Sequence, residues 1–277
     1  VPTTLMAIVD ASVGIKTGVD WCCPPSPALK NRVGSFYAPR SVLVSGEFVR
    51  SQDQRNVANG LGEVMKLGLV RSRKLFDLLL SPPAPLTAAS IPPGLISGAI
   101  EVMLGELGPN LLEEELGRAV DFGHTFSKVL EMLPGADVMH GEAVNIDGFF
   151  CNVLSLHRGY ITGATLALIV SCYESVGLPF WSPAIGAMFT EGVCEASLQD
   201  ALEHRDGMQR VPLVKGEIGS CAIVSDITMD ECRAALRWAN DRFGAQAQRP
   251  AESEVEGGEP EAVEAFENPG FWYHAGQ

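Results

Sequence analysis

The sequence lacks the features that mark two large classes of protein. It has no cluster of basic residues, and 34 acidic against 20 basic residues give a formal net charge of −14 at pH 7. A protein that binds nucleic acid or an anionic membrane surface needs a basic face, so we expect neither as a partner. No apolar run reaches the length needed to cross a bilayer, and we expect no membrane span.

Cysteine motifs are also missing. The seven cysteines are an odd number in scattered positions, and no Cys-x-x-Cys pair occurs among them. A disulfide framework would show an even number at regular spacings, whereas scattered reduced thiols are typical of the interior of a cell. We therefore expect a cytoplasmic protein. The adjacent Cys22 and Cys23 stand next to prolines, which predicts a surface loop.

The chain has no initiating methionine and no signal-peptide pattern. It begins "VPTTLMAIVD", an apolar run that is typical of a buried strand. From this opening we expect a fragment of a longer protein.

What is present predicts a mainly α-helical fold. Residues 5–19 read as a short β-like run followed by a loop with glycines, and residues 34–45 as a second β-like run. From Arg55 to Leu80 apolar residues recur every three or four positions until Pro82 and Pro83. Similar periods predict further helices at 95–107, 125–133, 141–156, 166–176, 191–204 and 230–243. We therefore predict a β remnant over residues 1–50, a helical domain over 51–243 and, because Glu and Pro dominate there, a disordered acidic tail over 244–277.

Three side chains suggest a metal site. Two of the five histidines, His124 and His140, each stand next to a glycine at the start of a helix-like run, and Glu63 shares a helix face with Lys66. One carboxylate and two imidazoles form a ligand set that suits a catalytic zinc ion with an open fourth position. Spacing alone leaves another interpretation open, in which the histidines cap helices and Glu63 pairs with Lys66 at the surface.

Five sequence blocks resemble a known family. They are "PTTLMAIVDASVGIKTGV", "KNRVGSFYAPRSVLV", "NGLGEVMKLGLV", "DFGHTFSKVLEM" and "HGEAVNID". Their order and spacing are similar to those of the sugar phosphate cyclases, the family of 3-dehydroquinate synthase, over residues 1 to about 243. The resemblance implies the C-terminal helical metal-binding domain of the dehydroquinate synthase fold, a short β remnant of an NAD-binding α/β domain, and a homodimer in the full-length family.

The resemblance also implies roles for individual residues. It assigns zinc or cobalt to Glu63, His124 and His140. It places NAD and the substrate beside a second set, Thr3, Thr4, Asp10, Lys30 and Asn31. It assigns catalytic or substrate-binding roles to a third set, Lys16, Lys66, Asp121 and His204. The segment "WCCPPSPAL", which precedes Lys30, is longer than the usual link of the family.

The substrate expectation rests on charge. Met103, Gly117 and His204 stand about where a dehydroquinate synthase has cations, and Asp121 replaces its Asn. Losing carboxylate-pairing cations suits a substrate with a neutral end, since an unpaired buried cation is costly. The blocks thus most resemble the 2-epi-5-epi-valiolone synthases, which act on sedoheptulose 7-phosphate. Those have Pro where this chain has Lys128, and 3-dehydroquinate synthase and desmethyl-4-deoxygadusol synthase remain alternatives.

The implied chemistry is a cyclisation in one site. NAD⁺ oxidises a secondary alcohol that zinc polarises, phosphate is eliminated, NADH returns the hydride, and an intramolecular aldol step closes the carbocycle. The dinucleotide-binding half of the family would precede Val1. An alternative of another class is therefore a non-catalytic metal-binding remnant or a partial gene product.

Overall fold

Helices dominate the part of the chain that the computed structural model describes, which comprises residues 1–21, 29–82 and 84–244. The α-helices are α1 Gln54–Val70, α2 Arg73–Leu80, α3 Pro93–Leu107, α4 Ser127–Glu131, α5 His140–His157, α6 Gly163–Val176, α7 Pro183–Met188, α8 Glu191–His204 and α9 Met229–Phe243. Two antiparallel hairpins pair β1 Val19–Trp21 with β2 Leu29–Val33 and β3 Val211–Val214 with β4 Cys221–Val224. Within these ranges no helix is both long and apolar enough to cross a membrane.

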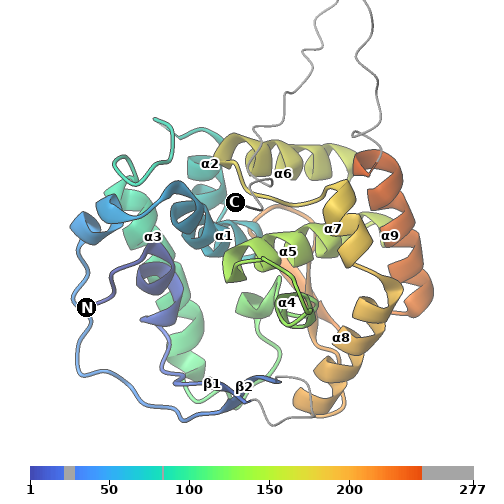
Figure 1. Cartoon of the computed structure of the whole chain (residues 1–277), viewed down its shortest axis with the longest axis horizontal. Coiled ribbons are helices and arrows are strands. Elements are labelled where there is room, and N and C mark those ends of the chain that lie inside the picture. The colour runs from blue at the N-terminus through green and yellow to red at the C-terminus, as the bar shows by residue number, and fades with distance from the viewer. Residues whose placement is uncertain (22–28, 83, 245–277) are drawn as a thin grey trace, which may run out of the picture. The chain divides into compact units, whose positions relative to one another are not determined.

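Helix α5 lies at the centre of the helical body (Figure 1). Every residue from Gly141 to Ser155 is buried, because α1, α4, α6, α9 and β3 pack around it. A helix that is enclosed on all sides needs no polar face. Its N-terminus begins at His140, where the side chain of Glu142 accepts a hydrogen bond from the backbone N–H of Met139 at 2.8 Å. The start of α5 therefore determines where His140, one of the candidate metal ligands, lies.

Helices α1 and α5 approach unusually closely where they cross. A Cβ atom added to Gly141 would lie 1.9 Å from the backbone oxygen of Asn59, and one added to Gly62 would lie 2.7 Å from the backbone oxygen of Gly141. Only glycine lets two backbones come this near. The side-chain oxygen of Asn59 accepts a hydrogen bond from the N–H of Gly141, which fixes the register of the crossing. Glu63 on α1 is thereby held near His140 on α5.

The predicted helix from Arg55 to Leu80 is two helices in the structure, so that prediction was wrong at its middle. Helix α1 ends at Val70, and α2 begins at Arg73. The hydroxyl oxygen of Ser72 accepts a hydrogen bond from the N–H of Leu75 at 3.3 Å, which makes Ser72 the N-cap of α2. The cap satisfies a free N–H of the new helix start and so favours a break over continuation.

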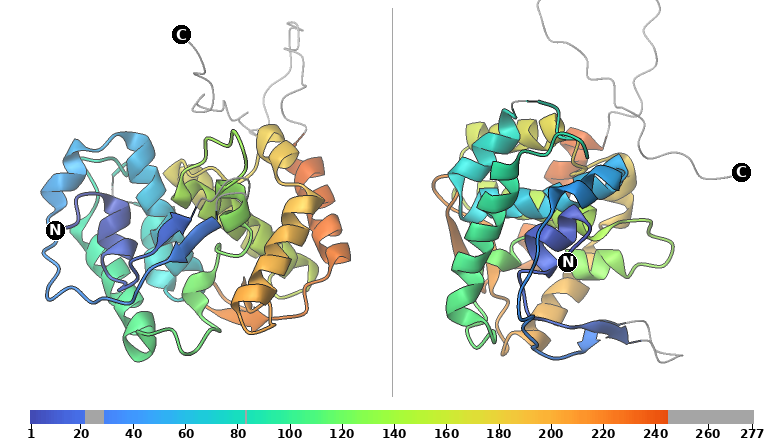
Figure 2. Two further views of the ribbon diagram at one scale, coloured as in Figure 1. Left: turned by 60° about the horizontal axis from the view of Figure 1, so that its bottom comes forward. Right: turned by 90° about the vertical axis from the view of Figure 1, so that its left-hand side faces the viewer.

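The N-terminal strand predictions were also wrong in position. Within residues 5–19 the chain forms a helical turn, the π-helix Ala7–Ala11, and reaches β1 only at Val19. Residues 34–45 form no strand beyond an isolated bridge between Lys16 and Phe36. They run as an open trace on the outside of the molecule towards the 3-10 helix Gly46–Ser51 and α1 (Figures 1 and 2). The β remnant is present, but as the β1–β2 hairpin.

Elsewhere the helical periods predicted the elements well. Helices α3, α5, α6, α8 and α9 lie where expected, whereas α4 is shorter than predicted and α7, β3 and β4 were not predicted. The described residues group into one compact unit, and the division at residue 50 stays a prediction. The tail from residue 245 and the pair Cys22 and Cys23 lie outside the described residues. The described cysteines are free: Cys151, Cys172, Cys194, Cys221 and Cys232.

Candidate metal and substrate site

Three side chains that are far apart in the sequence converge on one point. Oε1 of Glu63 lies 3.5 Å from Nε2 of His124 and 3.2 Å from Nε2 of His140. The donor atoms of the three residues all lie within 4.8 Å of one another. Glu63 comes from α1, His124 from the turn before α4, and His140 from the first position of α5. The structure thus brings together the three residues predicted as metal ligands.

These distances fit a tetrahedral ion. Zinc binds imidazole nitrogen and carboxylate oxygen at about 2.0–2.2 Å, which places tetrahedral donor atoms about 3.3 Å apart. Glu63 is fully buried: Lys66 pairs with its Oε2, and its Oε1 faces the Nε2 atoms of both histidines. A buried carboxylate is stable only where cations or hydrogen-bond donors compensate its charge. The residues present therefore fit a divalent ion between Glu63 and the two histidines.

The turn that carries His124 is fixed from two sides. Gly123 has a φ of +72°, and a Cβ atom there would lie 2.7 Å from the backbone oxygen of Val144 on α5, so only glycine fits. Oδ2 of Asp147, also on α5, accepts hydrogen bonds from the N–H groups of Thr125, Phe126 and Ser127 at 2.8, 2.6 and 2.9 Å. The turn can therefore not move away from α5 without losing these bonds.

Each imidazole has its Nδ1 occupied by an acceptor. Nδ1 of His124 lies 3.0 Å from the carbonyl oxygen of Phe122, and Nδ1 of His140 lies 3.0 Å from Oε1 of Glu131. A proton on Nδ1 that is donated in this way leaves the lone pair on Nε2. Both Nε2 atoms face Glu63. This tautomer is the one in which both rings can coordinate an ion beside Glu63.

The two histidines have pKa values shifted in opposite directions. Burial and the nearby charge of Lys66 lower the pKa of His124 to about 3. Burial also acts to lower the pKa of His140, but hydrogen bonds to Glu131 and Glu63 outweigh it and raise the pKa to about 9. In the absence of an ion, His140 is therefore the ring that carries a proton near neutral pH. A metal ion at this point would replace that proton.

Lys66 and Asp10 lie next to the carboxylate of Glu63. Nζ of Lys66 forms an ion pair with Oε2 of Glu63 and lies 3.6 Å from Oδ1 of Asp10. Burial would lower the pKa of Lys66, but the two carboxylates outweigh it and raise the pKa, so the ammonium stays charged. Lys66 thus places a positive charge next to Glu63, one of the candidate metal ligands.

Beside these residues lies a cavity of about 550 Å³, and His124 is the one candidate metal ligand among the residues that line it. Six predicted site residues line it: Asp10, Lys16, Asn31, Lys66, Asp121 and His124. One wall is apolar and includes Met103, which is buried, together with Leu107 and Leu111. A cavity of this size that combines an apolar wall with a few convergent polar groups is typical of a small-molecule site.

Arg118 was not predicted, and it changes the charge of the cavity. Its guanidinium donates to Asp121, with Nε at 3.2 Å from Oδ2, and forms an ion pair with Glu113, whose Oε1 also lies 2.9 Å from Nζ of Lys16. Burial would raise the pKa of Asp121, but Arg118 outweighs it and lowers the pKa. The cations Lys16 and Arg118 are therefore already paired with carboxylates of the chain.

Asn31 and Lys30 lie near the site in different ways. Asn31 has a φ of +54°, a left-handed conformation that asparagine tolerates better than most residues, and it lines the cavity. Lys30 does not line the cavity, but its Nζ forms an ion pair with Glu131 and lies 3.3 Å from Nδ1 of His140. Lys30 thus lies beside His140, one of the three candidate metal ligands.

The residues that line the cavity include neither Thr3, Thr4 and His204 nor the candidate ligands Glu63 and His140. Thr4 accepts a hydrogen bond from the N–H of Ala7 at 3.1 Å and so begins the first helical turn. Nδ1 of His204 lies 3.2 Å from Oδ1 of Asp200, and Nζ of Lys128 lies 3.9 Å from Oδ2 of the same side chain. His204 and Lys128 therefore meet at one carboxylate between α4 and α8. The roles predicted for these residues stay predictions.

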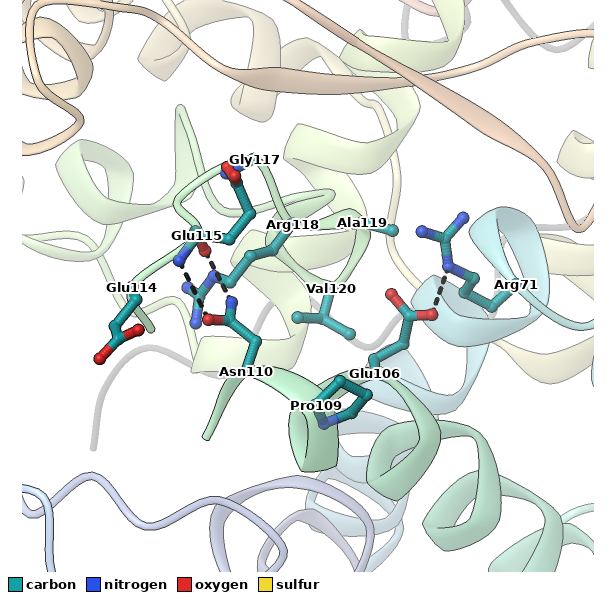
Figure 3. Close-up of a pocket in the computed structure, with 10 residues that line it drawn as sticks. All are labelled: Arg71, Glu106, Pro109, Asn110, Glu114, Glu115, Gly117, Arg118, Ala119 and Val120. Atoms are coloured by element: carbon teal, nitrogen blue, oxygen red, sulfur yellow. Dashed lines mark hydrogen bonds and ion pairs between the residues drawn. The ribbon is translucent and has the colours of Figure 1, made fainter. Parts of the chain in front are cut away.

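A second cavity of about 440 Å³ adjoins the first (Figure 3). The two share Arg118 and Val120, and the second also contains the ion pair between Arg71 and Glu106, whose Nε and Oε1 atoms are 2.7 Å apart. Gly117 lines this second cavity and not the first. The position at which the resemblance suggested a lost cation thus lies away from the candidate metal ligands.

Comparison with known proteins places the chain in a family. The sequence matches the model of the 3-dehydroquinate synthase N-terminal domain over residues 1–59 and that of the C-terminal domain over residues 60–201. The chain belongs to the 3-dehydroquinate synthase family. The predicted family and its mainly helical C-terminal fold are thereby confirmed.

Members of the 3-dehydroquinate synthase family that are named for different products are similar to the chain. The 2-epi-5-epi-valiolone synthase of Streptomyces hygroscopicus subsp. jinggangensis is 38% identical over 246 residues, which are 85% of this chain and 57% of that protein. The demethyl-4-deoxygadusol synthase of Trichormus variabilis is 34% identical over 248 residues, which are 85% of this chain and 58% of that protein. The chain thus spans less than two thirds of the length of these relatives.

A solved structure has the same fold. It is the 2-epi-5-epi-valiolone synthase of the same Streptomyces, with NAD⁺ and Zn²⁺ bound, and it matches with a TM-score of 0.79 at 38% identity. The match covers 87% of this chain and 65% of that one. The 3-dehydroquinate synthase fold therefore extends over nearly all of the described residues.

Proposed function

We propose that this chain provides the metal- and substrate-binding part of a sugar phosphate cyclase that converts sedoheptulose 7-phosphate into a carbocycle of the 2-epi-5-epi-valiolone type. The supporting observation is the convergence of Glu63, His124 and His140 beside a polar cavity that also holds Lys66. Zinc or cobalt would be held by the three converging residues. NAD⁺ would lie near Asp10 and Asn31, with Thr3, Thr4 and Lys30 as further contacts.

The described residues would each do a limited task. When bound, the metal ion supplies Lewis acidity that favours a developing alkoxide, and NAD⁺ accepts and returns the hydride. Lys66 keeps a positive charge beside the substrate hydroxyls, since Glu63 and Asp10 hold it ionised. Asp121 accepts hydrogen bonds from sugar hydroxyls through the sites that Arg118 leaves open. The cavity would hold the reacting atoms of one molecule together.

The charge of the cavity supports a sugar without a carboxylate. Met103 contributes an apolar surface, and the cations Lys16 and Arg118 already have carboxylate partners. A substrate carboxylate would have to compete with Glu113 and Asp121 for those cations, and Asp121 would repel it. Lys128 is held near Asp200, which weakens its attraction for a substrate carboxylate.

Two further parts of the proposal concern assembly and location. A homodimer is expected from the family, and a cytoplasmic location is supported by the free thiols of the described residues. The demethyl-4-deoxygadusol synthase and 3-dehydroquinate synthase activities are the alternatives within the family, because relatives of both kinds match the chain. A metal-binding protein without catalytic activity is the alternative of another class.

The metal part of the proposal predicts about one zinc or cobalt ion per chain. His140→Ala removes one of three ligands, so we expect purified His140→Ala protein to retain much less metal than the wild type. Metal analysis after equilibrium dialysis measures this, and His157→Ala, which removes a histidine at the far end of α5, is the matched control. Equal metal content in His140→Ala and wild type would refute the ligand assignment.

The substrate part predicts phosphate release in the presence of NAD⁺. The chain is assayed alone and joined to a complete N-terminal domain of the Streptomyces relative, with sedoheptulose 7-phosphate and with the carboxylated seven-carbon substrate of dehydroquinate synthase. We expect release from the first sugar in preference to the second. Preferential turnover of the carboxylated sugar would refute the assignment, and metal binding without turnover by either form would favour the non-catalytic alternative.

A further inference from the structure

We propose that Glu131 is a positioning residue that holds the imidazole of His140 in the orientation and tautomer needed to bind the metal ion. This inference rests on the metal site of the proposed function. The two ring nitrogens of His140 face two different carboxylates: Nδ1 lies 3.0 Å from Oε1 of Glu131, and Nε2 lies 3.2 Å from Oε1 of Glu63. A proton donated from Nδ1 to Glu131 leaves the Nε2 lone pair facing Glu63.

The second histidine shows why a carboxylate at this place matters. Nδ1 of His124 donates to the carbonyl oxygen of Phe122, a neutral backbone acceptor. Nδ1 of His140 instead donates to a carboxylate, and an anionic partner makes the opposite nitrogen a stronger donor to a metal ion. The two imidazoles of the site are thus unequal, and His140 is the ring whose affinity for the ion can be changed by one side-chain substitution.

Glu131 is itself held firmly. It is the last residue of α4, and the first turn of that helix is bound to Asp147 through three backbone N–H groups. Its Oε2 forms an ion pair with Nζ of Lys30 on β2, so each carboxylate oxygen has its own partner. The side chain is only 12% exposed, which limits competition from water. A carboxylate fixed at both oxygens can hold the ring of His140 in one plane.

The experiment compares metal binding in variants of the whole chain. Zn²⁺ affinity is measured by competition with a chromophoric chelator, and the coordination of Co²⁺ is followed by its visible absorption. Glu131→Leu removes the acceptor, and we expect its Zn²⁺ affinity to fall 10- to 100-fold. Glu131→Gln keeps an oxygen that accepts from Nδ1 but removes the charge. Its Zn²⁺ affinity should therefore fall less, and its Co²⁺ spectrum should stay that of the wild type.

Two variants serve as references. His140→Ala gives the affinity without this ligand, and Glu191→Gln makes the same chemical change at an exposed carboxylate on α8 that pairs with Arg233. Glu191→Gln should bind Zn²⁺ like the wild type. A changed Co²⁺ spectrum in Glu131→Leu that Glu131→Gln restores would support positioning, because a merely structural role for Glu131 would leave the spectrum of the folded protein unchanged.

The outcomes separate this inference from the proposed function. If His140→Ala loses the metal while both Glu131 variants bind it with wild-type affinity and spectrum, the positioning role is overturned and the metal site stands. If His140→Ala and the wild type bind Zn²⁺ equally, the metal site itself is overturned. Should Glu131→Leu fail to fold, Glu131→Ala removes the same acceptor with a smaller side chain, and wild-type affinity and Co²⁺ spectrum of that variant would overturn the positioning role.

Discussion

The helical body and the open segment of residues 34–48 are both rich in apolar residues, yet they differ completely in burial. In α5 every residue from Gly141 to Ser155 is buried. In the open segment Tyr37 is 75% and Leu43 67% exposed, and the large apolar residues Phe36, Val42, Val44 and Phe48 are exposed as well. An apolar sequence therefore shows which residues need a partner, but not whether the partner lies within the same 277 residues.

Backbone hydrogen bonding also differs between the two regions. A helix pairs its own backbone groups, whereas a strand needs a neighbour to accept and donate for it. No backbone–backbone hydrogen bond joins residues 38–44 to any other described residue. The helices thus satisfy their backbone hydrogen bonds internally. We expect substitutions in the helical body to change the free energy of unfolding strongly and those in the open segment to change it hardly at all.

The largest effect is expected inside the body, at Asp147. Asp147→Ala leaves three buried N–H groups without their acceptor and should lower the free energy of unfolding by about 3–5 kcal/mol. Urea denaturation measures this, with the midpoint compared at an unchanged slope. The control is Asp137→Ala, which removes a carboxylate that is 91% exposed and pairs with Arg55. A loss below about 1 kcal/mol for Asp147→Ala would show that the turn at His124 is held by other contacts.

A smaller effect is expected at the crossing of α1 and α5. Gly141→Ala places a methyl group on the backbone of Asn59, so the helices must separate, at a cost of roughly 1–3 kcal/mol. Metal affinity should fall too, because Glu63 and His140 move apart. Gly105→Ala in α3 is the matched control, since nothing lies within 4 Å of its added Cβ atom, and it should stabilise the chain slightly. Similar thermal unfolding of both variants would contradict a tight crossing.

The smallest effect is expected in the open segment. Leu43→Ala should change the free energy of unfolding by less than about 0.5 kcal/mol, because the side chain is mostly exposed. The same substitution at the fully buried Leu79 of α2 should cost about 2–5 kcal/mol. Denaturation of the two variants side by side tests the comparison directly. A large loss for Leu43→Ala would mean that the open segment packs against part of the chain in solution.

The same contrast explains how much of the fold could be predicted from the sequence. The helices α3, α5, α6, α8 and α9 were found because their periodicity reflects interactions within a few residues. The break between α1 and α2 was missed although Ser72 is a common type of N-cap, because the apolar period continues across it. Strands were misplaced at residues 5–19 and 34–45, since a strand-like sequence forms a strand only beside a partner.

Some residues of the candidate site could be predicted from the sequence, and others could not. Glu63, His124 and His140 were predicted because the resemblance carries each in its own sequence block, and the structure brings them together. Glu131 was missed because its partner His140 lies nine positions away on another helix. Arg118 was missed because its contact with Glu113 has no helical spacing and its contact with Asp121, at i,i+3, falls outside any predicted helix. Contacts that depend on the packing of separate elements leave no periodic signal in one sequence.

The crossing of α1 and α5 also has a consequence for the order of events during synthesis. The hydrogen bond between Asn59 and Gly141 joins residues 82 positions apart. At typical rates of translation the ribosome takes roughly 4–16 s to add that many residues. For most of this interval the nascent chain carries Glu63 but neither histidine, and His140 is added only at its end. Any factor that binds the emerging α1 would therefore act before the proposed metal site is complete.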